Sequence, residues 1–313
     1  MSNAAERMAV FAGVRDSFAR AESALGELCG WDLDDESIRK ITHAVARRAT
    51  VTRNQRDDVE RFQQASGQVE ALIDAGKVNT DTGWRDVKIS VLCKREADEP
   101  ITVDDWDKRD LPRPTAHTVV AAIEESAIFT NRVRLEADRL GATTATDVTV
   151  LADGGEWIWK LAVDVFPQAT GVLDAFHVIE HLADAVKAVW GEGTDETVAR
   201  LATGRRTLLS VGKAGIEQWL ADTFGEIPVG ISGDPLIDVA AYLMKHPTRL
   251  GYASRLAAGR SIGSGQVEGA VKQLVNRRMK KTGAKWKVAH VGPLVELAAL
   301  VDTPDWAGLW TVA

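Results

Sequence analysis

The chain has 313 residues, 45% apolar and 27% charged, which is typical of an ordinary globular protein. It has no run of about 18 apolar residues, and its N-terminus contains acidic residues and no long apolar core, which excludes a membrane-spanning or secreted class and predicts a cytoplasmic protein. Its two cysteines, Cys29 and Cys93, exclude a disulfide framework and a cysteine-based zinc site. The formal net charge of −7 excludes a chain that is basic throughout, but it leaves room for a local nucleic-acid surface.

The first part of the chain, residues 1–68, is predicted to be helical. Its apolar residues recur at helical spacing, first in Met8, Phe11, Val14 and Phe18 and then in Ile38, Ile41 and Val45. Asp34 to Ser37 supply capping residues for the second of these helical stretches.

The pattern changes at residue 69 to short strands that alternate with helices. Strands are predicted at 69–73, 87–92, 148–152 and 171–173, and helices at 115–140, after 155, and at about 175–190. Residues 191–250 are mostly helical in pattern, a further helix begins near Gln266, and the tail at 293–310 is helical and apolar. Such alternation predicts an α/β core with a helical insertion.

Two of the predicted strands are followed by an acid and small residues. The sequences are Ile73-Asp74-Ala75-Gly76 and Ala152-Asp153-Gly154-Gly155. Open α/β sheets place their sites at strand ends, so both acids are candidates for a site, although Asp-Gly is also a common turn.

A third acid, Glu268, lies in the helix predicted to begin near Gln266. At about 100° per residue it falls at the edge of the apolar stripe formed by Val271, Leu274, Val275 and Met279. Three convergent carboxylates repel one another unless a cation compensates them, and Mg²⁺ or Mn²⁺ prefers such oxygen ligands. Two of these ions can support phosphodiester chemistry.

The stretch from Lys245 to His290 is strongly basic inside an acidic protein. Glu268 is its only acid. We expect the following residues to contact DNA, against the alternative of a solvated helix face: Arg277, Lys280, Lys281, Lys285, Lys287 and Trp286.

Three blocks of the sequence resemble DDE insertion-sequence transposases of the ISKra type. GRSIGSGQVEGAVKQLVNRRMKKTGAKW resembles the C-terminal signature of that family, which is close to IGSG-x-VE followed by R-x-K-x-x-G-x-x-W. IDAGKVNTDTGWRDVKISVL resembles its first-aspartate block. LADGGEWIWKLAVDVFPQATGVLDAFHVIEHL resembles its second, including an Asp-x-x-His element. The resemblance covers roughly residues 69–310.

The resemblance implies a ribonuclease-H-like core, a mixed sheet flanked by helices, with an all-helical insertion and a helical N-terminal region. The expected divisions are 1–68 for the N-terminal region, 69–190 for the first part of the core, 191–250 for the insertion and 251–313 for the completion of the core. Asp74, Asp153 and Glu268 would form the catalytic, metal-binding triad.

The implied activity is cleavage of transposon ends followed by strand transfer, with two Mg²⁺ or Mn²⁺ ions as cofactors. Asp174 and His177 would support the site. The expected partners are double-stranded DNA, as transposon ends and as target, and further copies of the chain assembled on it. The implied setting is a bacterial cytoplasm, in association with the nucleoid.

The chain departs from the family pattern in three places. Ala75 stands where a glycine is expected, Pro304-Asp305-Trp306 replaces an Arg-Trp-Asp element, and the N-terminal region has no cysteine-based DNA-binding module. These departures keep two alternatives open: a truncated or inactive remnant that only binds DNA, and a nuclease that cleaves without strand transfer.

One motif indicates a different class of enzyme. His177-Val178-Ile179-Glu180-His181 spells H-x-x-E-H, the inverted zinc-peptidase motif, which sets two histidines on one helical face. No third ligand is evident in the sequence. A zinc metallopeptidase that uses His177, Glu180 and His181 is therefore the weaker alternative.

Overall fold

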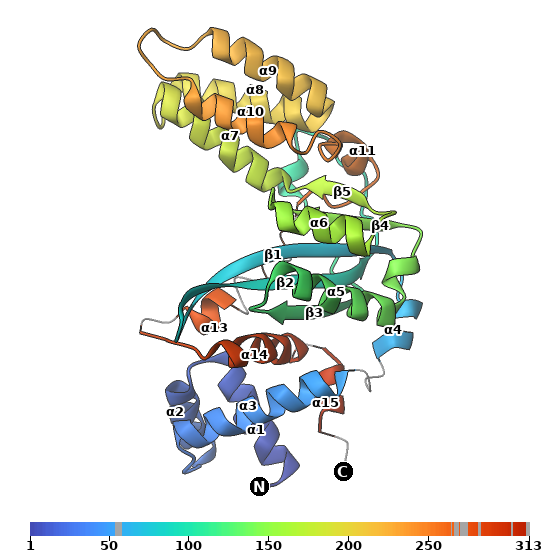
Figure 1. Cartoon of the computed structure of the whole chain (residues 1–313), viewed down its shortest axis with the longest axis vertical. Coiled ribbons are helices and arrows are strands. Elements are labelled where there is room, and N and C mark those ends of the chain that lie inside the picture. The colour runs from blue at the N-terminus through green and yellow to red at the C-terminus, as the bar shows by residue number, and fades with distance from the viewer. Residues whose placement is uncertain are drawn as a thin grey trace.

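The computed structural model describes residues 1–53, 58–263, 265, 269, 275–280, 283–301 and 303–310, with the side chain of Arg277 left out. Its centre is a five-stranded sheet in the order β3-β2-β1-β4-β5 (Figure 1). The strands are β1 (Gln68–Thr80), β2 (Gly83–Arg95), β3 (Ala116–Ala122), β4 (Val148–Ala152) and β5 (Thr170–Leu173). β1, β2 and β3 are antiparallel neighbours, whereas β4 and β5 run parallel to β1. This mixed α/β architecture is compatible with the expected ribonuclease-H-like class.

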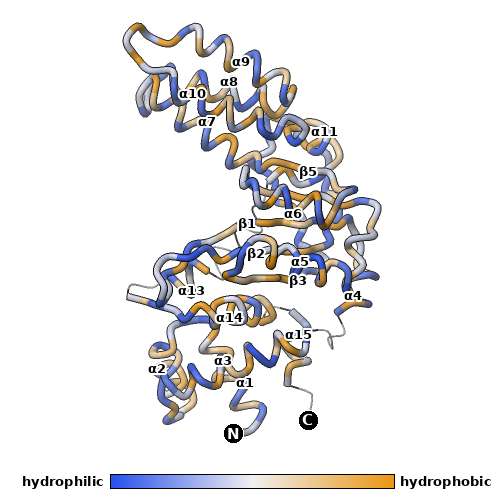
Figure 2. Tube along the Cα trace, viewed as in Figure 1, coloured by the Kyte–Doolittle hydropathy of each residue, from blue (hydrophilic) through white to orange (hydrophobic). Residues whose placement is uncertain are grey.

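Helices cover one face of the sheet and the outer edge of β3. α5 (Ser126–Leu140) packs on β2 and β3 and against α6 (Glu156–Val165). α14 (Val288–Leu300) runs along the outer edge of β3, where Glu296 accepts a hydrogen bond from the backbone N–H of Ala121. A Cβ at Gly292 would lie 2.6 Å from the Ala121 carbonyl oxygen, so glycine permits this close approach. β3 and α14 are both largely apolar in Figure 2, and their buried residues belong to the same core cluster. α14 thus covers the outer edge of β3, which protects it from pairing with another chain.

The N-terminal region is helical, as predicted. It consists of α1 (Asn3–Arg15), α2 (Phe18–Cys29), α3 (Asp35–Val51) and α4 (Asp58–Gln64), and α3 packs on α14 (Figure 1). The grouping of Phe18 with the first helix was wrong, because Ser17 caps a new helix by accepting a hydrogen bond from the Arg20 N–H. Asp34 caps α3 as expected.

A second group of helices lies at the opposite end of the molecule from the N-terminus (Figure 1). It contains α7 (Ala175–Trp190), α8 (Asp195–Val211), α9 (Lys213–Gly225) and α10 (Asp234–Met244), followed by α11 (Tyr252–Ala257). α7 packs on α8 and α10, and α8 packs on α9. The helical pattern predicted for 191–250 is confirmed. Among the described residues, no helix is both long enough and apolar enough to cross a membrane.

Short elements complete the described chain. These are η2 (Trp106–Lys108), η3 (Ala142–Thr144), α13 (Arg277–Met279) and α15 (Asp305–Gly308). The tail helix begins at Val288, five residues earlier than predicted, and continues through Pro293.

Two predictions about the strands were wrong. Residues 115–140 are not one helix, because Ala116–Ala122 form β3 and pair with β2, and the helix begins only at Ser126. β1 does not end at residue 73 but continues to Thr80, because β2 pairs with it along its whole length. Asp74 therefore lies inside a strand and not at its end.

Candidate active site

Three aspartates follow one row of paired residues across the parallel half of the sheet. Ile73 of β1 pairs with Ala152 of β4, and Ala152 pairs with Leu173 of β5. The next residue in each chain segment is an aspartate, namely Asp74, Asp153 and Asp174. Since neighbouring strands are about 4.8 Å apart, the three backbones lie side by side at one edge. β4 ends at Ala152, so its pairing with β1 stops at Ile73, one residue before Asp74.

Asp74 is a half-buried carboxylate in unfavourable surroundings. Burial raises its pKa above 3.8, and the charges of Asp153 and Asp174 raise it further. The Ala75 N–H, which donates to Asp74 Oδ1 at 2.6 Å, and the charge of His177 act in the opposite direction. The electrostatic coupling shows that these four side chains share one neighbourhood.

Asp153 begins a tight loop between β4 and α6. Its Oδ1 accepts a hydrogen bond from the Gly155 N–H at 2.8 Å, and its carbonyl oxygen accepts one from the indole N–H of Trp159 at 2.9 Å. Gly154 is pressed against α10, because a Cβ there would lie 2.1 Å from the Tyr242 ring. The charge of Asp153 in turn raises the pKa of the Tyr242 hydroxyl, although burial is the larger cause.

Asp174 is fully buried and fixes the start of α7. Its Oδ1 accepts hydrogen bonds from the N–H groups of Phe176 at 2.7 Å and His177 at 3.2 Å. Its own N–H donates to the Ala152 carbonyl at 2.8 Å, which ties the helix to β4. Asp174 thus fixes the first turn of α7, which carries His177.

Carboxylate oxygens are suitable ligands for a divalent cation, but the three aspartates alone do not form a complete metal-binding site in this arrangement. Among the described residues, no group of three or more His, Cys, Asp or Glu side chains is placed to hold a metal ion. Asp74, Asp153 and Asp174 each use Oδ1 to bind local backbone N–H groups. Within the part of the chain described, Oδ2 of Asp74 and of Asp153 accepts no hydrogen bond, so these hard oxygen donors remain for a cation.

The predicted third acid, Glu268, lies outside the described residues, and so does Lys281. The residues just before it are described: Ile262 accepts a hydrogen bond from the Ala175 N–H at 3.0 Å, and a Cβ at Gly263 would lie 3.4 Å from Asp174 Oδ1. The chain therefore passes beside Asp174 five residues before Glu268.

The expected DNA-binding residues differ in their exposure. Lys280, Lys285 and Lys287 are exposed, whereas Trp286 is buried and donates from its indole nitrogen to the Met279 carbonyl at 3.1 Å. Trp286 also joins the end of β1 through backbone hydrogen bonds with Asn79 and Asp81. Trp286 therefore packs in the core, and its backbone hydrogen bonds hold the segment that carries Lys285 and Lys287 against the end of β1.

The H-x-x-E-H motif lies on α7, as its spacing predicts. The ring centroids of His177 and His181 are 5.9 Å apart, and His177 Nδ1 is 3.7 Å from Glu180 Oε2. His181 packs on Tyr242 of α10, with centroids 4.6 Å apart. No observation on these residues favours a zinc peptidase.

Comparison with known families bears on the same region. Residues 132–213 match the transposase family model DDE_Tnp_ISL3. This transposase match confirms the resemblance to insertion-sequence DDE transposases, but it does not single out the ISKra type. The matched stretch runs from α5 to the start of α9 and includes Asp153, Asp174 and His177. No match was found among curated proteins.

Sequence reasoning missed Tyr242, His246 and Arg249, which lie beside the Asp153 loop. They come from the end of α10 and the turn after it, 89 to 96 residues along the chain from Asp153. No local motif marks them, because their proximity arises only from the packing of α10 on α7.

Proposed function

We propose that the protein is a DNA transposase that cleaves transposon ends in a metal-dependent reaction and joins the freed end to target DNA. The observation that carries this proposal is the row of three aspartates across adjacent parallel strands: Asp74 within β1, and Asp153 and Asp174 directly after β4 and β5. The transposase match over residues 132–213 includes two of the three. The fold supports a ribonuclease-H-like core, interrupted by the helices between β5 and α11.

In this proposal Asp74, Asp153 and Glu268 hold two Mg²⁺ or Mn²⁺ ions. Gly263, five residues before Glu268, lies beside Asp174, and this proximity supports Glu268 as the third ligand. When bound, such ions activate the attacking oxygen and stabilise charge on the phosphodiester. The chain itself supplies the orientation, because Asp174 caps α7 and holds His177 near Asp74.

The DNA partner follows from the chemistry. The exposed Lys280, Lys285 and Lys287 continue from the segment that contains Glu268 and are suited to phosphate contacts. Assembly of several copies on DNA and association with a bacterial nucleoid belong to the same proposal.

The test is cleavage of DNA that contains the borders of the gene, with the full chain and Mg²⁺ or Mn²⁺. We expect cleavage at the element's ends, then strand-transfer products, and loss of both in Asp153→Asn and Glu268→Gln. Asp86→Asn is the matched control, because Asp86 is an exposed strand aspartate outside the row.

The other possible results of this cleavage experiment each correspond to an alternative function or contradict the proposed triad. Binding without cleavage by the unaltered chain indicates a remnant that only binds DNA. Cleavage without strand-transfer products indicates a nuclease. Cleavage that survives both substitutions, or that requires zinc, contradicts the proposed triad.

A further inference from the structure

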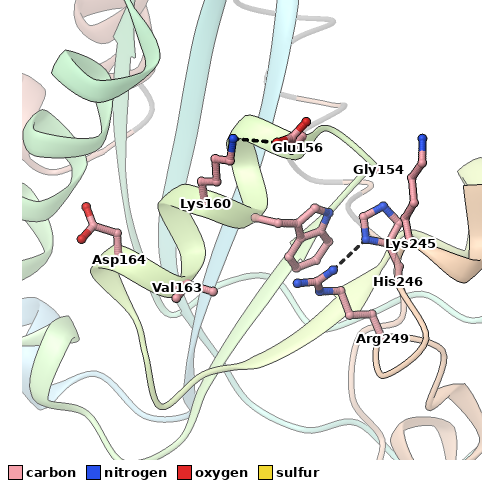
Figure 3. Close-up of a pocket in the computed structure, with 9 residues that line it drawn as sticks. Gly154, Glu156, Lys160, Val163, Asp164, Lys245, His246 and Arg249 are labelled. Carbon is pink, nitrogen blue, oxygen red and sulfur yellow. Dashed lines mark hydrogen bonds and ion pairs between the residues drawn. The ribbon is translucent and has the colours of Figure 1, made fainter.

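An open cavity of about 730 Å³ lies next to the Asp153 loop, between α6 and the turn that follows α10 (Figure 3). Its walls include Gly154 and Trp159 on one side and Lys245, His246 and Arg249 on the other. Because Trp159 also bonds the carbonyl oxygen of Asp153, the cavity and the candidate active site share a wall.

The acids that line the cavity are already neutralised by neighbouring cations. Glu156 Oε1 is 2.6 Å from Lys160 Nζ, a pair that is visible in Figure 3. Asp164 Oδ2 is 2.6 Å from a terminal nitrogen of Arg134. Lys245 still acts on Glu156 through its charge, whereas no carboxylate of the cavity acts on Arg249.

Arg249 is half-buried, and within the described chain it has no carboxylate partner. Its guanidinium carbon lies 3.9 Å from the centroid of the Trp159 ring, and Nη1 is 2.7 Å from His246 Nδ1. Burial lowers the pKa of Arg249, and no acid offsets that effect. The guanidinium lies over an indole, and among the described residues only Nη1 makes a hydrogen bond, so the remaining N–H groups can donate to an anion.

His246 adds a second donor that the fold leaves unused. Since the guanidinium donates to Nδ1, the ring proton of neutral His246 must be on Nε2. The residue is only 4% exposed, and among the described residues its Nε2 has no hydrogen-bond partner of normal geometry. Burial lowers the pKa of His246, and the nearby Gly154 backbone acts in the opposite direction. A buried donor in that state favours an acceptor from a ligand.

A glycine makes space for the stacked arginine. A Cβ at Gly171 would lie 3.0 Å from Trp159 Cζ3 and 3.2 Å from Arg249 Nε. Any larger residue at this position would push the indole and the guanidinium apart, so the fold provides the room that the stack needs.

We propose that Arg249 and His246 form a phosphate-binding site that holds a backbone phosphate of DNA beside the scissile position. The site rests on the proposed function for the identity of the ligand, because its position next to Asp153 makes DNA the phosphate source. Lys245 adds charge at the mouth. Trp159 transmits the position of the bound phosphate to the Asp153 loop.

The first measurement is the binding of a fluorescent generic duplex to the full chain as a function of salt. Arg249→Gln should weaken binding about tenfold and reduce the log–log salt slope by about one unit, the effect of one lost phosphate contact. Arg249→Lys keeps the positive charge but loses the planar set of guanidinium N–H donors. The salt slope of this variant should therefore stay near that of the unaltered chain, while its affinity for DNA falls. The matched control is Arg113→Gln, an exposed arginine near the opposite edge of the sheet, which should change neither quantity.

The second measurement uses inorganic phosphate without DNA and follows the broadening of its ³¹P resonance by the protein. The unaltered chain should broaden it, and Arg249→Gln and His246→Gln, shown to be folded by circular dichroism, should not. If neither DNA binding nor phosphate broadening depends on Arg249, the site does not exist. If only broadening depends on it, the site takes a free phosphate, and the assignment to DNA is overturned. If the unaltered chain binds no DNA at all, the proposed function fails, while phosphate broadening still decides whether the anion site exists.

Discussion

Asp74 is a carboxylate that the fold holds at an energetic disadvantage. Burial raises its pKa, and the charges of Asp153 and Asp174 add to the effect. The folded chain therefore binds this proton more tightly than the unfolded chain does. As the pH rises from 3.8 through the raised pKa of the folded state, Asp74 progressively reduces the free energy of unfolding.

Asp74→Asn should therefore stabilise the metal-free protein at neutral pH by roughly 1 kcal/mol, the usual size of a gain at a functional site. The gain should disappear well below pH 3.8, where both states hold the proton. Thermal unfolding at several pH values measures it. Mg²⁺ should raise the melting temperature of the unaltered chain but not of the variant, and a variant less stable than the parent at neutral pH would contradict this account.

At the scale of elements, the contact between α10 and the β4–α6 loop controls how Asp153 is presented. Gly154→Ala would place a Cβ 2.1 Å from the Tyr242 ring, and the resulting overpacking should cost about 1–3 kcal/mol. Tyr242→Ala should remove the clash, so the double variant should be less destabilised than the sum of the two single changes. Urea unfolding of the four proteins tests the coupling, and additive effects would show that the loop moves away without cost.

The basic stretch around α13 divides into buried and exposed cations. Arg278 is 3% exposed, donates to the Gly13 carbonyl and lies over the rings of Phe18 and Trp286, so Arg278→Ala should destabilise the fold. Replacement of Arg277, Lys280 and Lys281 by alanine should leave the melting temperature nearly unchanged. It should lower the log–log salt slope of DNA binding by about two to three units, similarly for all DNA sequences. An unchanged slope would show that these three cations do not contact the DNA backbone.

The sequence predicts an element correctly where nearby residues determine it, and fails where pairing with a distant segment determines it. β4, α6 and α7 were predicted correctly because each has its own pattern of apolar residues, and α7 also has a local cap in Asp174. The break between Ala122 and Ser126 was missed because no glycine or proline marks it, and pairing with β2 decides that the first part is a strand. Asp74 and Asp153 were chosen from their neighbours, but their alignment in one row depends on the register between strands, which no local pattern encodes.

At the scale of the whole molecule, Arg53, whose side chain is 12% exposed, joins the N-terminal helices to the core. Arg53, just after α3, donates to the Val119 carbonyl at 2.8 Å and pairs with Glu296 of α14 at 3.1 Å and with Glu136 of α5 at 3.6 Å. Both glutamates are almost fully buried. Arg139 extends the network from Glu136 to Asp58 of α4.

Arg53→Met should destabilise the protein by about 3–5 kcal/mol, because it leaves the charge of buried Glu296 poorly compensated. Adding Glu296→Gln should recover part of the loss. Arg20→Ala, which breaks the exposed pair with Asp16, should cost less than about 1 kcal/mol. Chemical unfolding measures all three, and equal effects of Arg53→Met and Arg20→Ala would rule out a joining role.

The alignment of Ile73, Ala152 and Leu173 also governs where the chain can change in length. One residue inserted in β4 would shift Asp153 out of the row and turn its side chain to the other face of the sheet. The turn between α9 and α10 has no such restriction: Val229 is fully exposed there, at the end of the molecule farthest from the N-terminus (Figure 1). A peptide tag or a small reporter domain placed after Val229 should leave the fold and the aspartate row intact, which makes this turn the place to attach a label.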